Sequence, residues 1–113
     1  YQFIDGGMTD NIRPALYDAE YSCDVVNKMT EDKSVVCDIA GKCCESGDII
    51  IYNALLPKTE NGDVLMVYAT GAYNYSMASN YNNMLKPAVV FIDKQPKLVA
   101  RRETLDDLLK LFK

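Results

Sequence analysis

Hydrophobic residues along this chain fall in short runs that polar turns separate. Five runs are rich in β-branched or aromatic residues, namely residues 34–40, 48–56, 63–73, 87–93 and 97–103. This composition is typical of β-strands. No segment between the runs forms a helix long enough for a parallel crossover connection. The pattern therefore predicts a mainly β domain, arranged as an antiparallel barrel or a sandwich.

Two further signals refine this arrangement. Asn61-Gly62, in the polar stretch 57–63, is a strong hairpin signal between two runs. Near the end of the chain, Thr104 followed by Asp107 resembles a capping box, which marks the start of a helix. The positions after it form one apolar stripe: Leu105, Leu108, Leu109 and Phe112. We expect a short C-terminal helix that covers a barrel edge or docks on a neighbour.

Composition limits the function classes. The chain of 113 residues is long enough for one domain, and its 49% hydrophobic and 25% charged residues are ordinary for a globular protein. A net charge of −4 without a run of Lys or Arg argues against nucleic-acid binding. There is no apolar stretch of membrane-spanning length and no lipidation motif, so we expect no membrane partner. The chain begins at Tyr1 inside a strand-like segment, which suggests a piece of a larger protein.

Four cysteines, Cys23, Cys37, Cys43 and Cys44, allow three disulfide pairings. Their spacing does not suggest a disulfide framework, and the neighbours Cys43 and Cys44 can hardly bridge each other without strain. Without histidine or a C-x-x-C pair, a structural metal site is not expected either. We therefore expect reduced thiols in a cytoplasmic protein, with Cys23, Cys37 and Cys43 structural.

The stretch that follows Gly6-Gly7 carries a candidate anion site. Pro14 can start a helical turn, which places Arg13 and Tyr17, four residues apart, on one side. A guanidinium beside a phenol suits a carboxylate or a phosphate. The alternative is a turn in which the arginine pairs with Asp10 or Asp18.

The segment CCESGD places a thiol and two carboxylates just before an apolar run. Gly47 lets the chain bend, and Asp48 can satisfy backbone donors near the start of the strand. A thiol such as that of Cys44 is a good proton donor or nucleophile when it is exposed and its pKa is tuned. The alternative is a buried, inert Cys44 beside a solvated Glu45.

The segment GAYNYSMASNYN, residues 71–82, is rich in hydroxyl and amide groups. Its phenols and hydroxyls, including that of Tyr73, could line a ligand pocket, or the segment could be a polar surface loop. Residues 76–84 are too polar for a confident helix, so we expect an irregular loop with one helical turn.

Taken together, DGGMTDNIRPALYDA, CESGD and GAYNYSMASNYN, in this order and followed by RRET, closely resemble the C-terminal domain of the diaminopimelate decarboxylases. These are pyridoxal-phosphate enzymes of the alanine-racemase-like fold type, which convert meso-diaminopimelate to lysine and CO2. The resemblance covers essentially the whole chain. It implies that residues 1–113 form an antiparallel β-barrel domain, and that a (β/α)8 barrel with the cofactor lysine precedes it in a cytoplasmic homodimer.

The resemblance also implies roles for individual residues. Arg13 and Tyr17 would hold the substrate carboxylate or the cofactor phosphate, and Tyr73 would contact the cofactor and the substrate. Cys44 would protonate the substrate carbon in the partner's site. Glu45, with Ser46 beside it, would bind the distal ammonium of the substrate. Related ornithine decarboxylases have Cys-Asp at the position of Cys44-Glu45, which favours diaminopimelate as the substrate.

Two departures from the family pattern bear on substrate fit. Lys42 and Cys43 stand where the family commonly has proline before the Cys-Glu pair, and Glu20-Tyr21 replaces an expected aromatic and histidine. Two other interpretations remain: a decarboxylase of ornithine, lysine or arginine, and a non-catalytic β-barrel interaction module. No segment resembles the cofactor-lysine strand, so we expect the chain alone to be inactive.

Overall fold

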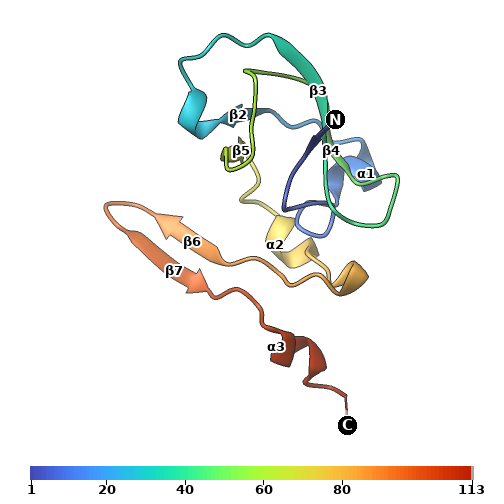
Figure 1. Ribbon diagram of the computed structural model, residues 1–113. Coiled ribbons are helices and arrows are strands. Elements are labelled where there is room, and N and C mark those ends of the chain that lie inside the picture. The colour runs from blue at the N-terminus through green and yellow to red at the C-terminus, as the bar shows by residue number, and fades with distance from the viewer. Residues whose placement is uncertain (113) are drawn as a thin grey trace.

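The computed structural model describes residues 1–112, and its central element is a hairpin of two strands (Figure 1). Strand β3 (Val35–Ala40) runs antiparallel to β4 (Ile49–Leu56), as the two apolar runs predict. A β-bulge interrupts the register opposite Asp38, where Asn53 adopts a left-handed φ of 52° and donates its backbone N–H to the Asp38 carboxylate. Asparagine tolerates this conformation better than most residues, and the bulge bends the hairpin.

Three separate sheets are present within residues 1–112. Strand β1 (Gln2–Phe3) adds to the hairpin alongside β3 in a parallel pairing, so the expectation of a purely antiparallel arrangement is wrong for this pair. Strands β2 (Cys23–Val25) and β5 (Leu65–Val67) form a second, antiparallel sheet. Strands β6 (Val89–Ile92) and β7 (Pro96–Ala100) form the third, also antiparallel. The domain is mainly β, as predicted.

The predicted hairpin at Asn61-Gly62 is wrong. The turn itself forms, with Gly62 at a φ of 96°. The strands on its two sides do not pair, however, because β4 pairs with β3 and β5 pairs with β2. The turn therefore carries the chain from one sheet to another instead of closing a hairpin.

The helical segments are all short. Helix α1 (Arg13–Tyr17) begins at Arg13, with Pro14 in its first turn as predicted. The expected loop contains two helical turns instead of one, α2 (Asn74–Met77) and η2 (Tyr81–Asn83). Another such turn, η1 (Val26–Lys28), follows β2. Helix α3 (Leu105–Leu109) starts with the predicted capping box between Thr104 and Asp107. No helix among residues 1–112 has both the length and the apolar character needed to cross a membrane.

The hydrophobic core lies between the central hairpin and β2. It consists of Val25, Ile39, Ile50, Ile51, Ala54 and Leu56. The C-terminal arm, which we define as residues 84–112, contributes none of these residues and extends away from the body (Figure 1, orange to red). Its predicted apolar stripe is largely exposed, with Leu105 66% and Phe112 77% accessible. The expected covering of a sheet edge by α3 is therefore absent from this structure.

Candidate active-site surface

The first half of the candidate site is an arginine that lies between two phenol rings. The Arg13 guanidinium carbon is 5.3 Å from the ring centre of Tyr17 and 5.0 Å from that of Tyr73. Within residues 1–112, Arg13 takes part in none of the ion pairs, so the alternative pairing with Asp10 or Asp18 does not form. Two electron-rich ring faces hold the cation without neutralising its charge.

The backbone explains how Tyr73 reaches Arg13. Helix α1 brings Tyr17 onto the side of Arg13 through the four-residue spacing, which is a local effect. Tyr73 comes from the loop after β5, where its φ of 69° is unusual for an aromatic residue. Strained backbone of this kind persists only where the surroundings enforce it, and it is concentrated at functional sites.

Arg13 and Tyr73 line a cleft of about 370 Å3. Its other walls come from Ala19–Ser22 and from Tyr68, Ala69 and Ala72. Both Tyr17 and Tyr73 are more than 60% exposed, so the cation and the two hydroxyls can be reached from solvent. The cleft can therefore bind a small anion such as a carboxylate or a phosphate.

The second half of the candidate site is the Cys44 loop, residues 41–48, which connects β3 to β4. Cys44, Glu45 and Ser46 are all exposed, so the alternative of a buried, inert Cys44 is wrong. The Cys44 backbone N–H donates to Asn82 Oδ1 at 2.9 Å, and Glu45 Oε1 accepts from Gly47 N at 3.1 Å. The Glu45 side chain thus folds back over its own loop.

The adjacent cysteines differ in their surroundings. Cys43 is partly buried, and desolvation, reinforced by the nearby Asp48 carboxylate, raises the pKa of its thiol. A raised pKa disfavours the reactive thiolate. The two neighbouring thiols therefore differ in exposure, while the roles predicted for them, packing for Cys43 and proton delivery for Cys44, stay predictions. All four cysteines are free.

The three sequence motifs lie side by side in the fold. The backbone N–H of Ser79, in the third motif, donates to the Thr9 carbonyl of the first motif at 3.1 Å. Asn82, also in the third motif, accepts a hydrogen bond from the backbone N–H of Cys44 in the second. Asn82 is not among the site residues predicted from the sequence, although the asparagine-rich composition of its segment was a signal. Among residues 1–112, no hydrogen bond or ion pair joins the Arg13 cleft directly to Cys44, Glu45 or Ser46. The predicted residues therefore form two exposed groups on one scaffold.

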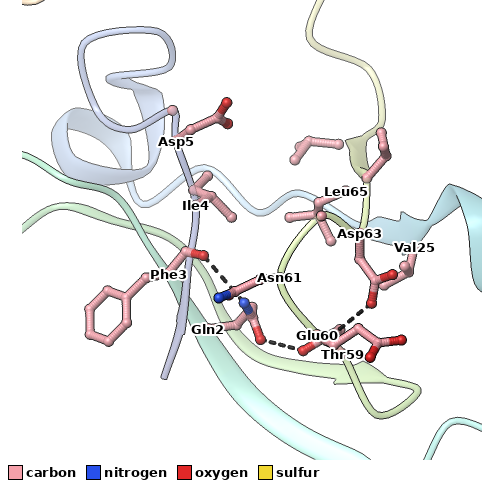
Figure 2. A pocket seen from close by; sticks show the side chains of 14 residues that line it. Gln2, Phe3, Ile4, Asp5, Val25, Thr59, Glu60, Asn61, Asp63 and Leu65 are labelled. Carbon is pink, nitrogen blue, oxygen red and sulfur yellow. Dashed lines mark hydrogen bonds between the residues drawn. The ribbon is translucent and has the colours of Figure 1, made fainter.

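A separate cavity of about 630 Å3 lies between β1 and the turn before β5 (Figure 2). It is lined by Gln2, Ile4, Val25, Thr59 and Leu65, with carboxylates from Asp5, Glu60 and Asp63. None of the predicted site residues lines it. Lys28 engages two of its acids, Glu60 at 3.2 Å and Asp63 at 2.9 Å. This cavity is therefore separate from both the Arg13 cleft and the Cys44 loop.

Within residues 1–112 there is no group of three or more Cys, Asp or Glu side chains that could hold a metal ion. The features that remain are a cationic cleft with phenols and an exposed thiol beside a carboxylate. They lie on a small, mainly β domain that exposes both groups to solvent.

Comparison with known proteins identifies the family to which this domain belongs. Residues 1–71 match the family described as the C-terminal sheet domain of pyridoxal-dependent decarboxylases. The chain belongs to this family. It is 52% identical to the diaminopimelate decarboxylase of Bacillus subtilis over 112 residues, which is 98% of this chain and 26% of that protein. The chain thus spans about a quarter of the length of the curated relatives it matches.

Solved structures agree with this assignment. The diaminopimelate decarboxylase of M. jannaschii, in complex with L-lysine, superposes with a TM-score of 0.91 and 38% identity over 98% of this chain and 25% of that one. The lysine/ornithine decarboxylase of Vibrio vulnificus, in complex with cadaverine, gives a TM-score of 0.61 and 28% identity over 72% of this chain and 22% of that one.

Proposed function

We propose that this chain is the C-terminal β-domain of a diaminopimelate decarboxylase, which converts meso-2,6-diaminopimelate to L-lysine and CO2. Identity of 52% to such an enzyme, spread over 98% of the chain, supports the proposal most directly. The weaker match to the lysine/ornithine enzyme supports diaminopimelate over the other basic amino acids. The parent enzyme is a pyridoxal-dependent carboxy-lyase.

The Arg13 cleft fits one side of a cofactor and substrate site. Its cation is unpaired and flanked by two phenols, as an incoming carboxylate or phosphate requires. The residues that line the cleft, which include no lysine, offer contacts to a ligand. Pyridoxal phosphate, when bound, supplies an electron sink for the carbon that loses CO2. Arg13 and Tyr17 orient the carboxylate or phosphate, and Tyr73 contacts both ligands.

The Cys44 loop supplies proton delivery and selectivity. Cys44 gives its Sγ proton to the substrate carbon, a role that needs the exposure the thiol has in this fold. The Glu45 carboxylate binds the distal ammonium, and Ser46 adds a hydrogen bond there. For this the Glu45 side chain releases its bond to Gly47 N, which is an exposed contact and costs little.

The rest of the parent protein completes the assembly. We propose an N-terminal (β/α)8 barrel that holds most of the cofactor and a homodimer in which the Cys44 loop enters the partner's site. The exposed apolar side chains of the C-terminal arm, such as Phe91 and Ile92, support further packing against protein. Additional strands from the parent would close the separate sheets into a barrel. Four free thiols are compatible with a cytoplasmic location.

The first test separates this assignment from a non-catalytic module. The full-length protein should release CO2 from meso-diaminopimelate when pyridoxal phosphate is present, whereas the 113-residue chain alone should not. A Cys44→Ala variant should lose activity and a Cys37→Ala variant should keep most of it. A full-length protein that binds the cofactor but acts on no amino acid would contradict the proposal.

The second test addresses the substrate. Shortening the carboxylate by Glu45→Asp should lower kcat/KM for diaminopimelate relative to ornithine by about tenfold, a typical effect of one methylene on specificity. Glu31→Asp, at an exposed position in a loop, is the matched control and should leave the ratio unchanged. Equal rates on ornithine and diaminopimelate before substitution would favour the broader basic amino-acid decarboxylase.

A further inference from the structure

The carboxylate of Asp48 joins the turn after Gly7 to the Cys44 loop. Asp48 is only 3% exposed. Its Oδ1 accepts from the Met8 backbone N–H at 2.6 Å, and its Oδ2 accepts from the Cys43 backbone N–H at 2.8 Å. No ion pair within residues 1–112 involves Asp48. Since a buried polar side chain is costly without hydrogen-bond partners, these two N–H groups are what stabilises Asp48 in this position.

Two glycines make room for this carboxylate. A Cβ on Gly41 would overlap with both oxygens of Asp48, and a Cβ on Gly7 would lie 2.8 Å from Oδ2. Neither glycine is at a positive φ, so the requirement is for space and not for backbone freedom. Gly7, Gly41 and Asp48 therefore form one unit, although they come from distant parts of the sequence.

The same residue also closes the loop through its own backbone. Gly41 N donates to Asp48 O at 2.9 Å, and Asp48 N donates to Glu45 O at 3.1 Å. Asp48 therefore contacts the loop at Gly41, Cys43 and Glu45, on both sides of exposed Cys44. Two backbone hydrogen bonds and a buried carboxylate therefore restrain this exposed loop. It has little freedom to change its shape.

We propose that Asp48 is a positioning residue, which holds residues 41–47 in the conformation that presents Cys44 and Glu45. Through Met8 it also keeps this loop in register with the segment that leads into Arg13. The inference rests on the proposed function for the roles of Cys44, Glu45 and Arg13. The ordering of the loop is independent of that function and can be measured separately.

The first measurement needs no substitution. In the full-length protein, amide hydrogen exchange should be slower at Met8 and Cys43 than at Lys42 and Ser46, by at least about tenfold, because the latter two donate no hydrogen bond in this loop. Exchange at Met8 and Cys43 as fast as at Ser46 would overturn the proposal, whatever any variant does.

The second measurement uses Asp48→Asn, which keeps the shape but turns an amide NH2 toward one of the two N–H donors. Exchange in residues 6–8 and 41–47 should rise about tenfold. The value of kcat should fall about ten- to a hundredfold, as displaced catalytic groups imply, while cofactor affinity and KM change little. Gly41→Ala, which displaces the carboxylate without removing it, should reproduce this pattern.

Asp63→Asn is the matched control. Asp63 also accepts a backbone N–H, from Glu60 at 2.9 Å, but it lies in the turn before β5 and away from the Cys44 loop. Its loss should leave exchange in residues 41–47 and kcat unchanged. If Asp48→Asn lowers kcat without faster exchange in this loop, the proposal fails. If exchange behaves as expected but no decarboxylation is found, the positioning role stands and the proposed function fails.

Discussion

The body of the molecule, which we define as residues 1–74, and the C-terminal arm differ in how many of their side chains are buried. Within residues 1–112 every buried side chain lies in the body, where Ile39 and Leu56 are fully covered. In the arm, Ile92 is 81% exposed and Leu98 60% exposed, although both lie in strands. Both regions are rich in β-branched and aliphatic residues, so composition does not separate them.

The difference comes from the number of pairing partners. The body has a hairpin with a third strand and a second sheet that packs over it, whereas β6 pairs only with β7. A two-stranded hairpin is marginally stable in water without packing on one face. The body therefore contains its own core, whereas the arm contributes no buried side chain within residues 1–112. Figure 1 shows the consequence, since β6, β7 and α3 extend from the rest of the fold.

The largest contrast should appear on truncation of leucines. Leu56→Ala removes a fully buried side chain from the core and should lower the free energy of unfolding of the chain by about 2–5 kcal/mol. Leu98→Ala, at an exposed strand position, should change it by less than about 0.5 kcal/mol. Urea denaturation measures both. A larger cost for Leu98→Ala in the full-length protein would show that the parent covers the arm; equal costs in the isolated chain would contradict the comparison.

An effect of intermediate size is expected on the pH dependence of stability, through the carboxyl group of Asp63. The hydrogen bond from Lys28 lowers the pKa of Asp63 from 3.8 to about 2. A lowered carboxyl pKa stabilises the fold above the unfolded value, and this contribution is lost as the pH falls from about 4 through 2. Asp63→Asn should therefore lower the free energy of unfolding at pH 7. Near pH 2 its free energy of unfolding should match that of the unsubstituted protein. Asp32→Asn, at an exposed loop position that takes part in no ion pair within residues 1–112, is the control. A difference in stability between Asp63→Asn and the unsubstituted protein that persists at low pH would contradict the account.

The smallest and most local effect should come from the arm. Thr104→Ala removes the side chain that accepts the Asp107 backbone N–H and should cost α3 about 0.5–2 kcal/mol. Amide exchange at residues 105–109 should accelerate while that of β3 and β4 stays the same. Thr30→Ala, at an exposed turn without a recorded cap, is the control. Faster exchange in the core strands would mean that body and arm are coupled.

Local signals predicted the strands well. Residues 34–40 and 48–56 were expected as strands, and β3 and β4 occupy 35–40 and 49–56. Residues 63–73 were expected as one strand, yet β5 ends at Val67. The backbone turns at Ala69 and Tyr73, both at positive φ, and this turn brings Tyr73 to Arg13. Alternation of residue types carries no information about such a turn.

The sequence by itself determined the elements that depend on near neighbours. Pro14 lies in the first turn of α1, which aligns Arg13 with Tyr17, and Thr104 caps α3, because each interaction spans fewer than five residues. Only the tertiary structure decided that Asn61-Gly62 joins two sheets and that Tyr73 covers Arg13. It also placed the Asp48 carboxylate between Gly7 and Gly41, since contacts across some forty residues depend on how the sheets pack and not on any local pattern.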